Sequence, residues 1–283
     1  MGGMSQTPRI RDEPDNGPAI RLFTIAHRML FGLCVVLAGM MVAEVTSVAV
    51  RPEVSGRLAA ALALAATLST LMSLSRQLPV QNVLLAAAII GAVGGFAGAI
   101  GRTYHLPLCP LEHLAAASPR LGDTLSWWMP PVWIIFLLNS RGAARLILRP
   151  RRKTDNYGFL LIGLTVALSF VFELGLGLFL AAMNGHRTRN PVGSQAFDWS
   201  GAPLRFYAGW TATVCLALFC ATPVLINKKP VEFPPDYQPL ILWTLLNLVF
   251  VCGAVAGRFG PEAAPLSAAI AATLLLAWRS ARR

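Results

Sequence analysis

GFLLIGLTVALSFVFELGLGLFLAA, residues 158–182, is an apolar stretch with a single charged side chain, that of Glu173. A helix of about 20 apolar residues is long enough to cross the roughly 30 Å hydrocarbon layer of a bilayer. The stretch therefore predicts a transmembrane helix. Because a charged group is costly to hold in hydrocarbon, a carboxyl inside such a helix is a candidate functional group.

The rest of the chain has the same character. Of its 283 residues, 55% are hydrophobic and only 13% are charged, and the mean hydropathy is +0.59. This composition is typical of an integral membrane protein. The fold class we expect is all-α, a polytopic helical bundle with about eight transmembrane helices. The expected spans lie near residues 29–50, 58–76, 83–100, 127–148, 158–182, 207–227, 238–257 and 263–279.

Basic residues predict the orientation of these spans. With the N-terminus in the cytoplasm, roughly twice as many Lys and Arg fall on the inner side as on the outer side, as the positive-inside rule requires. The densest cluster is RLILRPRRK at 145–153. We therefore expect both termini in the cytoplasm and a multi-pass protein of the cell inner membrane. Residues 1–28 are expected to be a disordered tail, and residues 29–283 a single transmembrane domain.

The net charge of +11 comes from residues near the ends of the expected spans. They are placed to contact anionic membrane lipids, and no nucleic-acid partner is expected. His105, Cys109 and His113 recur every four residues, a spacing that would align metal ligands on a helix. Pro107 and Pro110 interrupt that stretch, so ordinary loop residues are the expectation. No metal and no other cofactor is predicted.

Two acids lie inside apolar spans, Glu44 and Glu173. Counted from the outer ends of their spans, they differ in depth by about 5 Å at 1.5 Å per residue. Two carboxyls in one cavity would share a proton near neutral pH and so supply a general acid shielded from water. The alternative is structural: each acid accepts a hydrogen bond between helices, or Glu44 reaches the interface.

Glycines mark close approaches between helices. In GAVGGFAGAIG, residues 91–101, Gly91 and Gly95 are four residues apart, as are Gly94 and Gly98, a spacing that favours tight helix packing. Gly175 and Gly177 next to Glu173 allow two interpretations. Either another helix packs there, or the missing side chains leave room for a slender ligand.

Residues 129–245 resemble a family of membrane-bound carotenoid biosynthesis proteins that contains bisanhydrobacterioruberin hydratase and γ-carotene 1′,2′-hydratase. Five segments carry the resemblance: MPPVW at 129–133, NYGFLLIGLTVALSFVFELGL at 156–176, FDW at 197–199, GAPLRFYAGW at 201–210 and PPDYQPLILW at 234–243. The family has an acidic pattern D-L-x-x-D-P in a membrane helix, followed by G-V-P-x-x-N-F-x-G-W.

The chain departs from both patterns. Glu173 stands where the family has its first Asp, so that acid is kept, whereas Gly177 and Leu178 stand at the second Asp and the Pro. Phe206 stands where the second pattern has Asn, although Gly201, Pro203, Gly209 and Trp210 are kept. The resemblance therefore implies the fold and a polyene ligand more strongly than it implies the activity.

The activity that the resemblance implies is hydration of a terminal C=C bond in an acyclic carotenoid or other isoprenoid. The alkene is protonated to a tertiary cation, which then captures water, so the site needs a dry acid, aromatic faces and one positioned water. Glu173 would donate the proton, Asp198 would orient the water, and Glu44 would replace the missing second acid. The substrate-binding residues would be Trp133, Trp199, Pro203 and Trp210, although tryptophans also serve as interface anchors.

The implied partners are an apolar polyene or isoprenoid lipid and other membrane enzymes of a pigment pathway. Two other functions stay open. One is a protein that binds or transports a lipid without changing it. The other is a proton-coupled transporter that uses Glu44 and Glu173.

Overall fold

The computed structural model describes residues 18–47, 52–103, 120–121, 125–127, 129–183, 198–199, 202–226 and 236–282. Long helices dominate this part of the chain, with four two-residue strands and a short 3-10 helix between them. The long helices are α1 (Pro18–Val45), α2 (Pro52–Ser75), α3 (Val80–Thr103), α4 (Met129–Ile147), α5 (Tyr157–Met183), α6 (Leu204–Leu225), α7 (Gln238–Ala256) and α8 (Gly260–Ala281).

The shorter elements lie in the connections. Strand β1 (Arg120–Leu121) pairs antiparallel with β2 (Leu125–Ser126) before α4, and β3 (Asp198–Trp199) pairs with β4 (Ala202–Pro203) before α6. The 3-10 helix η2 (Arg149–Arg151) follows α4. Apart from these, the described residues confirm the expected all-α fold class.

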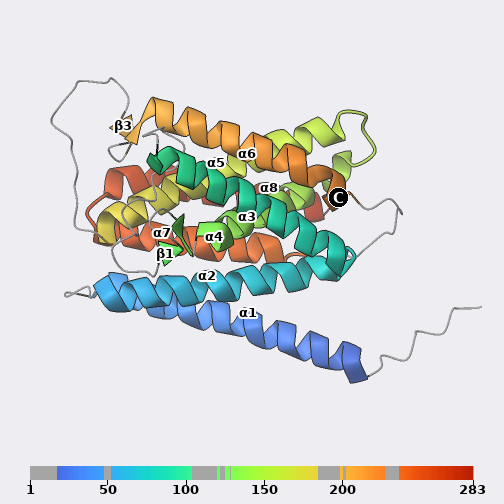
Figure 1. Ribbon diagram of the computed structural model, residues 1–283, viewed down its shortest axis with the longest axis horizontal. Coiled ribbons are helices and arrows are strands. Elements are labelled where there is room, and N and C mark those ends of the chain that lie inside the picture. The colour runs from blue at the N-terminus through green and yellow to red at the C-terminus, as the bar shows by residue number, and fades with distance from the viewer. Residues whose placement is uncertain are drawn as a thin grey trace, which may run out of the picture.

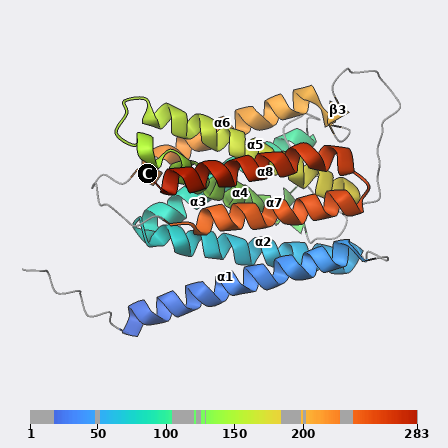
Figure 2. The same ribbon diagram turned by 180° about the vertical axis from the view of Figure 1, so that it is seen from behind.

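The helices lie side by side along the length of the molecule (Figure 1). The start of α1 and the end of α8 lie at one end of the bundle, which we call the terminus end (Figures 1 and 2). Strands β1 and β3 lie toward the other end, which we call the hairpin end. Helix α1 forms one edge of the bundle and α6 the opposite edge in both views.

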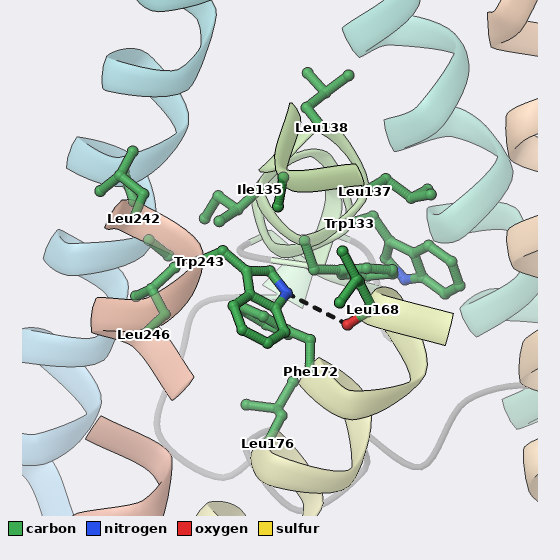
Figure 3. Packing of buried hydrophobic residues seen from close by; sticks show 14 of the residues in the cluster. Trp133, Ile135, Leu137, Leu138, Leu168, Phe172, Leu176, Leu242, Trp243 and Leu246 are labelled. Carbon is green, nitrogen blue, oxygen red and sulfur yellow. Dashed lines mark hydrogen bonds between the residues drawn. The ribbon is translucent and has the colours of Figure 1, made fainter. Parts of the chain in front are cut away.

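Helix α4 is the centre of the bundle. It packs against α2, α3, α5, α7 and α8, and most of its side chains are buried. One apolar core joins residues from all eight long helices, including Trp133 of α4, Trp210 of α6 and Trp243 of α7, each at most 1% exposed. Figure 3 shows how Trp133, Phe172 and Trp243 from three different helices meet in this core. The site described below therefore forms around α4.

Within the described residues, seven helices are long and apolar enough to cross a membrane, all except α4. Helix α4 has lower hydropathy because Asn139, Ser140, Arg141 and Arg145 occupy its second half. Helix α1 presents a row of exposed apolar side chains, including Leu22, Ile25, Met29, Leu33 and Val36. A helix face of this kind suits contact with lipid chains. A multi-pass membrane protein follows from these helices, and the count of eight spans stays a prediction.

The predicted spans agree with helices α2 to α8 to within a few residues at most ends. Helix α1 differs most, since it begins at Pro18, whereas the span was predicted from residue 29. The predicted disordered tail is therefore wrong for residues 18–28, which are helical, and residues 1–17 lie outside the described part. Proline is favoured in the first turn of a helix, where its missing N–H costs no hydrogen bond.

Candidate functional site

Glu173 lies in the middle of α5 and is 4% exposed. Within the described residues its carboxyl group has no hydrogen bond or salt bridge. Ser169, one turn earlier on the same face, is fully buried, and its hydroxyl also has no partner. An unpaired polar group in such a place costs free energy, which makes these two side chains candidates for a role other than packing.

Aromatic rings from α4, α5 and α6 stack beside this part of α5. The ring centroids of Trp133 and Trp210 lie 6.1 Å apart, with 29° between the planes. Phe136 lies 4.8 Å from Trp133 and 5.5 Å from Trp210. On α5, Phe172 lies 5.9 Å from Phe136, and Phe170 lies 6.3 Å from Trp210. We call these five residues the aromatic cluster. Trp133 and Trp210 lie inside the bundle and are not interface anchors.

Helix geometry places Glu173 on the side of α5 that faces the cluster. At about 100° per residue, Phe170 and Phe172 lie on two sides of an arc that contains Ser169 and Glu173. The opposite side of the helix carries Gly175, which faces α7 and α8. Phe172 contacts Phe136 of α4, and Phe170 contacts Trp210 of α6. Because Glu173 lies between these two directions, its carboxyl is on the side of α5 that faces the cluster.

Close packing against glycines fixes the position of the cluster. A Cβ atom added to Gly94 of α3 would lie only 2.2 Å from Cγ of Trp133, so the indole lies directly on the backbone of α3. A Cβ atom added to Gly91 would lie 3.2 Å from Cβ of Pro130, so α3 and α4 are close there as well. The prediction that this glycine segment allows close approach is confirmed for Gly91 and Gly94, where the neighbour is α4.

Gly175 proves to be a packing position. A Cβ atom there would lie 3.1 Å from side-chain atoms of Phe250 in α7 and Leu266 in α8. Of the two interpretations of this glycine, the structure therefore favours helix packing over room for a ligand. Nothing comparable is described for Gly177.

An apolar cavity of about 80 Å³ lies on the other side of Phe172. Small residues of α2, such as Gly56, Ala59 and Ala63, leave the space, and all of the lining residues are apolar. Phe172 is shared between the cavity and the aromatic cluster, whereas Glu173 and Glu44 do not line the cavity. The remaining lining residues are Met41, Ala60, Leu62, Val132, Ile135, Leu176, Phe179, Leu180, Leu246, Val249 and Phe250.

Glu44 is also buried, at 9% exposure, but it lies at another level of the bundle. Its neighbour Val45 and Phe179 of α5 both approach Gly253 of α7. Val45 is therefore level with Phe179, six residues and about 9 Å along α5 from Glu173. Glu44 precedes Val45 by one residue, so its offset from Glu173 is about 7–8 Å, which is larger than the roughly 5 Å expected from the sequence. The structure does not bring the two acids together.

Asp198, Trp199 and Pro203 belong to the short hairpin that precedes α6. In the paired strands Asp198 stands opposite Pro203, and Trp199 opposite Ala202. The hairpin leads directly into α6, where Trp210 lies about 9 Å further along the axis. The backbone thus places these three residues at the hairpin end, directly before the helix that carries one tryptophan of the cluster. The possible metal ligands His105, Cys109 and His113 lie outside the described residues.

The sequence interpretation missed the polar half of α4. Asn139 and Ser140 are fully buried, and Arg141 is 7% exposed. Asn139 donates a hydrogen bond to the hydroxyl of Thr70 in α2 at 2.9 Å. Arg141 falls inside the predicted span 127–148 but was assigned to the inner side with the loop residues. The rule that singled out Glu173, a charge within an apolar span, would have found it.

No family model, no curated protein and no solved structure matches this chain. The resemblance to carotenoid hydratases therefore stays a prediction from the residues quoted above. Any function has to be argued from the site itself, which consists of an unpaired buried carboxyl, a five-ring aromatic cluster and a neighbouring apolar cavity.

Proposed function

We propose that the chain is an enzyme of the cell inner membrane that hydrates a terminal C=C bond of an acyclic carotenoid or related isoprenoid. In this proposal all eight helices cross the bilayer, and both termini lie in the cytoplasm. The observation that carries the proposal is the unpaired Glu173 carboxyl on the side of α5 that faces the aromatic cluster. Such a group is shielded from water, as a general acid that protonates an alkene needs to be.

The reaction would start from the protonated Glu173. Its proton is transferred to the less substituted carbon of the terminal C=C bond, which leaves a tertiary cation on the other carbon. The two π electrons of the C=C bond form the new C–H bond. A water molecule then adds to the cation through its oxygen. The excess proton of that water returns to the Glu173 carboxylate, so alkene and water become a tertiary alcohol and the acid is regenerated.

The aromatic cluster would stabilise the cation between these two steps. The faces of tryptophan rings attract cations, and the interaction strengthens when water is excluded. Trp133 and Trp210 are each 1% exposed and stack with their faces inclined by 29°. The apolar cavity on the other side of Phe172 would hold a short stretch of the substrate's hydrocarbon chain next to the reacting end group.

The water would come from the hairpin end of the bundle. Asp198 precedes α6 there and is the acid we assign to orienting the water. Glu44 is not needed in this scheme, because it lies about 7–8 Å further toward the hairpin end than Glu173. A single buried acid would therefore act both as the donor and as the final acceptor of the proton.

A second function is favoured by the apolar cavity itself. Its lining contains no acid, and neither Glu173 nor Glu44 borders it. A protein that binds or transports a polyene without chemistry would need apolar contacts of this kind and no acid. In that case pigment would copurify with unchanged mass, whether or not Glu173 is replaced.

Expression in a strain that accumulates an acyclic carotenoid tests the proposal. Wild type should add one water per reactive end group, seen as a more polar pigment by chromatography and mass spectrometry. Glu173→Gln should lose the product, whereas Glu262→Gln, a matched change of a partly exposed acid in α8, should keep it. Equal product from wild type and Glu173→Gln would refute the role of Glu173. Absence of hydrated pigment with wild type would favour the binding function.

A further inference from the structure

A second cavity, of about 110 Å³, lies at the terminus end of the bundle. It is bordered by the ends of α2 and α4 and by the starts of α5 and α7. Four arginines line it: Arg141 and Arg145 of α4, then Arg149 and Arg152 in and after η2. We call it the arginine pocket. It lies at the opposite end from the hairpins, so it is separate from the site proposed for hydration.

Arg141 forms the deepest charged part of the pocket. It is 7% exposed, and its Nη1 atom has no hydrogen-bond partner within the described residues. A buried guanidinium normally pairs with an anion or with carbonyl oxygens, because an unpaired buried charge is costly. The unused donor therefore points to an acceptor that the described chain does not supply.

The acid that lines the pocket is already occupied. One carboxylate oxygen of Asp236 accepts hydrogen bonds from the hydroxyl of Ser73 at 2.5 Å and from Nε2 of Gln77 at 3.1 Å. The other accepts a bond from the backbone N–H of Gln238 at 3.0 Å. The pocket lining holds four arginines and one carboxylate, so positive charge is in excess there. The hydrogen bonds that Asp236 accepts all come from neutral donors and none from an arginine.

Packing holds the walls of the pocket in place. A Cβ atom on Gly142 would lie 2.4 Å from Pro239, so α4 and α7 touch directly there. Arg145 donates a hydrogen bond from Nη1 to Oε1 of Gln77 in the connection after α2, at 3.3 Å. Arg149 and Arg152 are exposed, whereas Arg141 is buried, so the pocket runs from the surface into the bundle.

We propose that the arginine pocket binds a phosphate group, which is carried by an anionic phospholipid of the adjoining leaflet or by soluble phosphate. The planar guanidinium fork suits bidentate hydrogen bonds to phosphate oxygens. Basic pockets between transmembrane helices are suited to anionic lipid headgroups. A neutral side chain that can donate a hydrogen bond, that of Tyr157, also lines the pocket. This inference does not depend on the hydratase proposal.

Native mass spectrometry of the purified full chain in detergent tests the proposal. Added phosphatidylglycerol should be retained more than phosphatidylcholine, whose choline group cancels the charge of its phosphate and leaves the headgroup without net attraction to the arginines. The double variant Arg145→Gln/Arg149→Gln should reduce retention of phosphatidylglycerol about tenfold or more, since each charge-assisted bond accounts for a large part of the affinity.

The matched control is Arg151→Gln/Lys153→Gln. It also removes two positive charges, from the exposed segment that contains Arg149, but neither residue lines the pocket. The control should retain the lipid as wild type does. If the control loses as much lipid as the pocket variant, or if wild type retains both lipids equally, the pocket does not bind a phospholipid, and only soluble phosphate is left as its ligand. Should the double variant not fold, the single exposed change Arg152→Gln takes its place, with an expected loss of several-fold.

Inorganic phosphate distinguishes the two sources of the ligand. If free phosphate raises the thermal midpoint of wild type but not of Arg152→Gln, the pocket accepts soluble phosphate. If phosphatidylglycerol alone has this effect, the phosphate comes from a lipid. If neither ligand stabilises wild type more than Arg152→Gln, the pocket is not a phosphate site.

Discussion

Replacing Gly94 by alanine is expected to disturb the aromatic cluster from the neighbouring helix. The new Cβ would lie 2.2, 2.4 and 2.5 Å from three atoms of the Trp133 indole, whereas carbon atoms pack at about 3.5–4.0 Å. The ring would have to move by more than about 1 Å. It is 1% exposed and stacked on Trp210 and Phe136, so no open space receives it. Overpacking of this kind costs about 1–3 kcal/mol.

For a chain of this size, that cost corresponds to a thermal midpoint lower by about 2–5 °C. Unfolding in detergent, followed by intrinsic tryptophan fluorescence, would measure it. Gly163→Ala in α5 is the control, because its added Cβ meets nothing within 4 Å and alanine favours the helix. Adding Trp133→Phe to Gly94→Ala should recover part of the loss, since the smaller ring leaves room. Equal midpoints for the two alanine variants would refute the packing argument.

Three further changes test other parts of the structure. Asp236→Asn should lower the free energy of unfolding by about 1–3 kcal/mol, because the Asp236 carboxylate accepts three hydrogen bonds. In the same thermal assay the control Asp155→Asn, at an exposed site, should have little effect. Ala63→Leu should fill the apolar cavity and reduce pigment retained per mole of purified protein at least ~10-fold, whereas Ala61→Leu, exposed on the same helix, should not. Equal retention would exclude the cavity as the polyene site. Glu173→Gln should leave the thermal midpoint unchanged or raised, since a buried unpaired carboxyl does not stabilise the fold. A large drop in the midpoint would mean that Glu173 is structural.

Apolar run lengths were sufficient to locate most of the helices. The spans predicted for α5 and α7 match the observed helices to within one residue at each end. This agreement is expected because the length of the apolar run and the length of the helix both follow from the thickness of the bilayer. The start of α1 at Pro18 was missed because residues 18–28 are too polar to read as membrane-crossing. They extend the helix beyond the hydrophobic stretch.

The site was predictable only in part. The cost of burying a carboxyl singled out Glu173 in the sequence, and the structure shows it buried and unpaired within the described residues. Trp133 and Trp210 could have been interface anchors as well as core residues, because the linear sequence does not show which helices enclose them. The depth of Glu44 depends on how α1 packs against α7, where Val45 lies beside Gly253, and the linear sequence does not show this contact. Arg141 was overlooked because its burial results from the five helices that surround α4.

Hydration in deuterated water most directly tests whether Glu173 protonates an alkene. Membranes that contain the protein would be supplied with an acyclic carotenoid in D₂O, and the product would be analysed by mass spectrometry. The account predicts that wild type places one deuterium on the carbon next to the new tertiary alcohol. It also predicts that Glu173→Gln slows this incorporation by about 10²-fold or more, as expected on loss of a general acid. Undiminished incorporation with Glu173→Gln, or no incorporation with wild type, would contradict it.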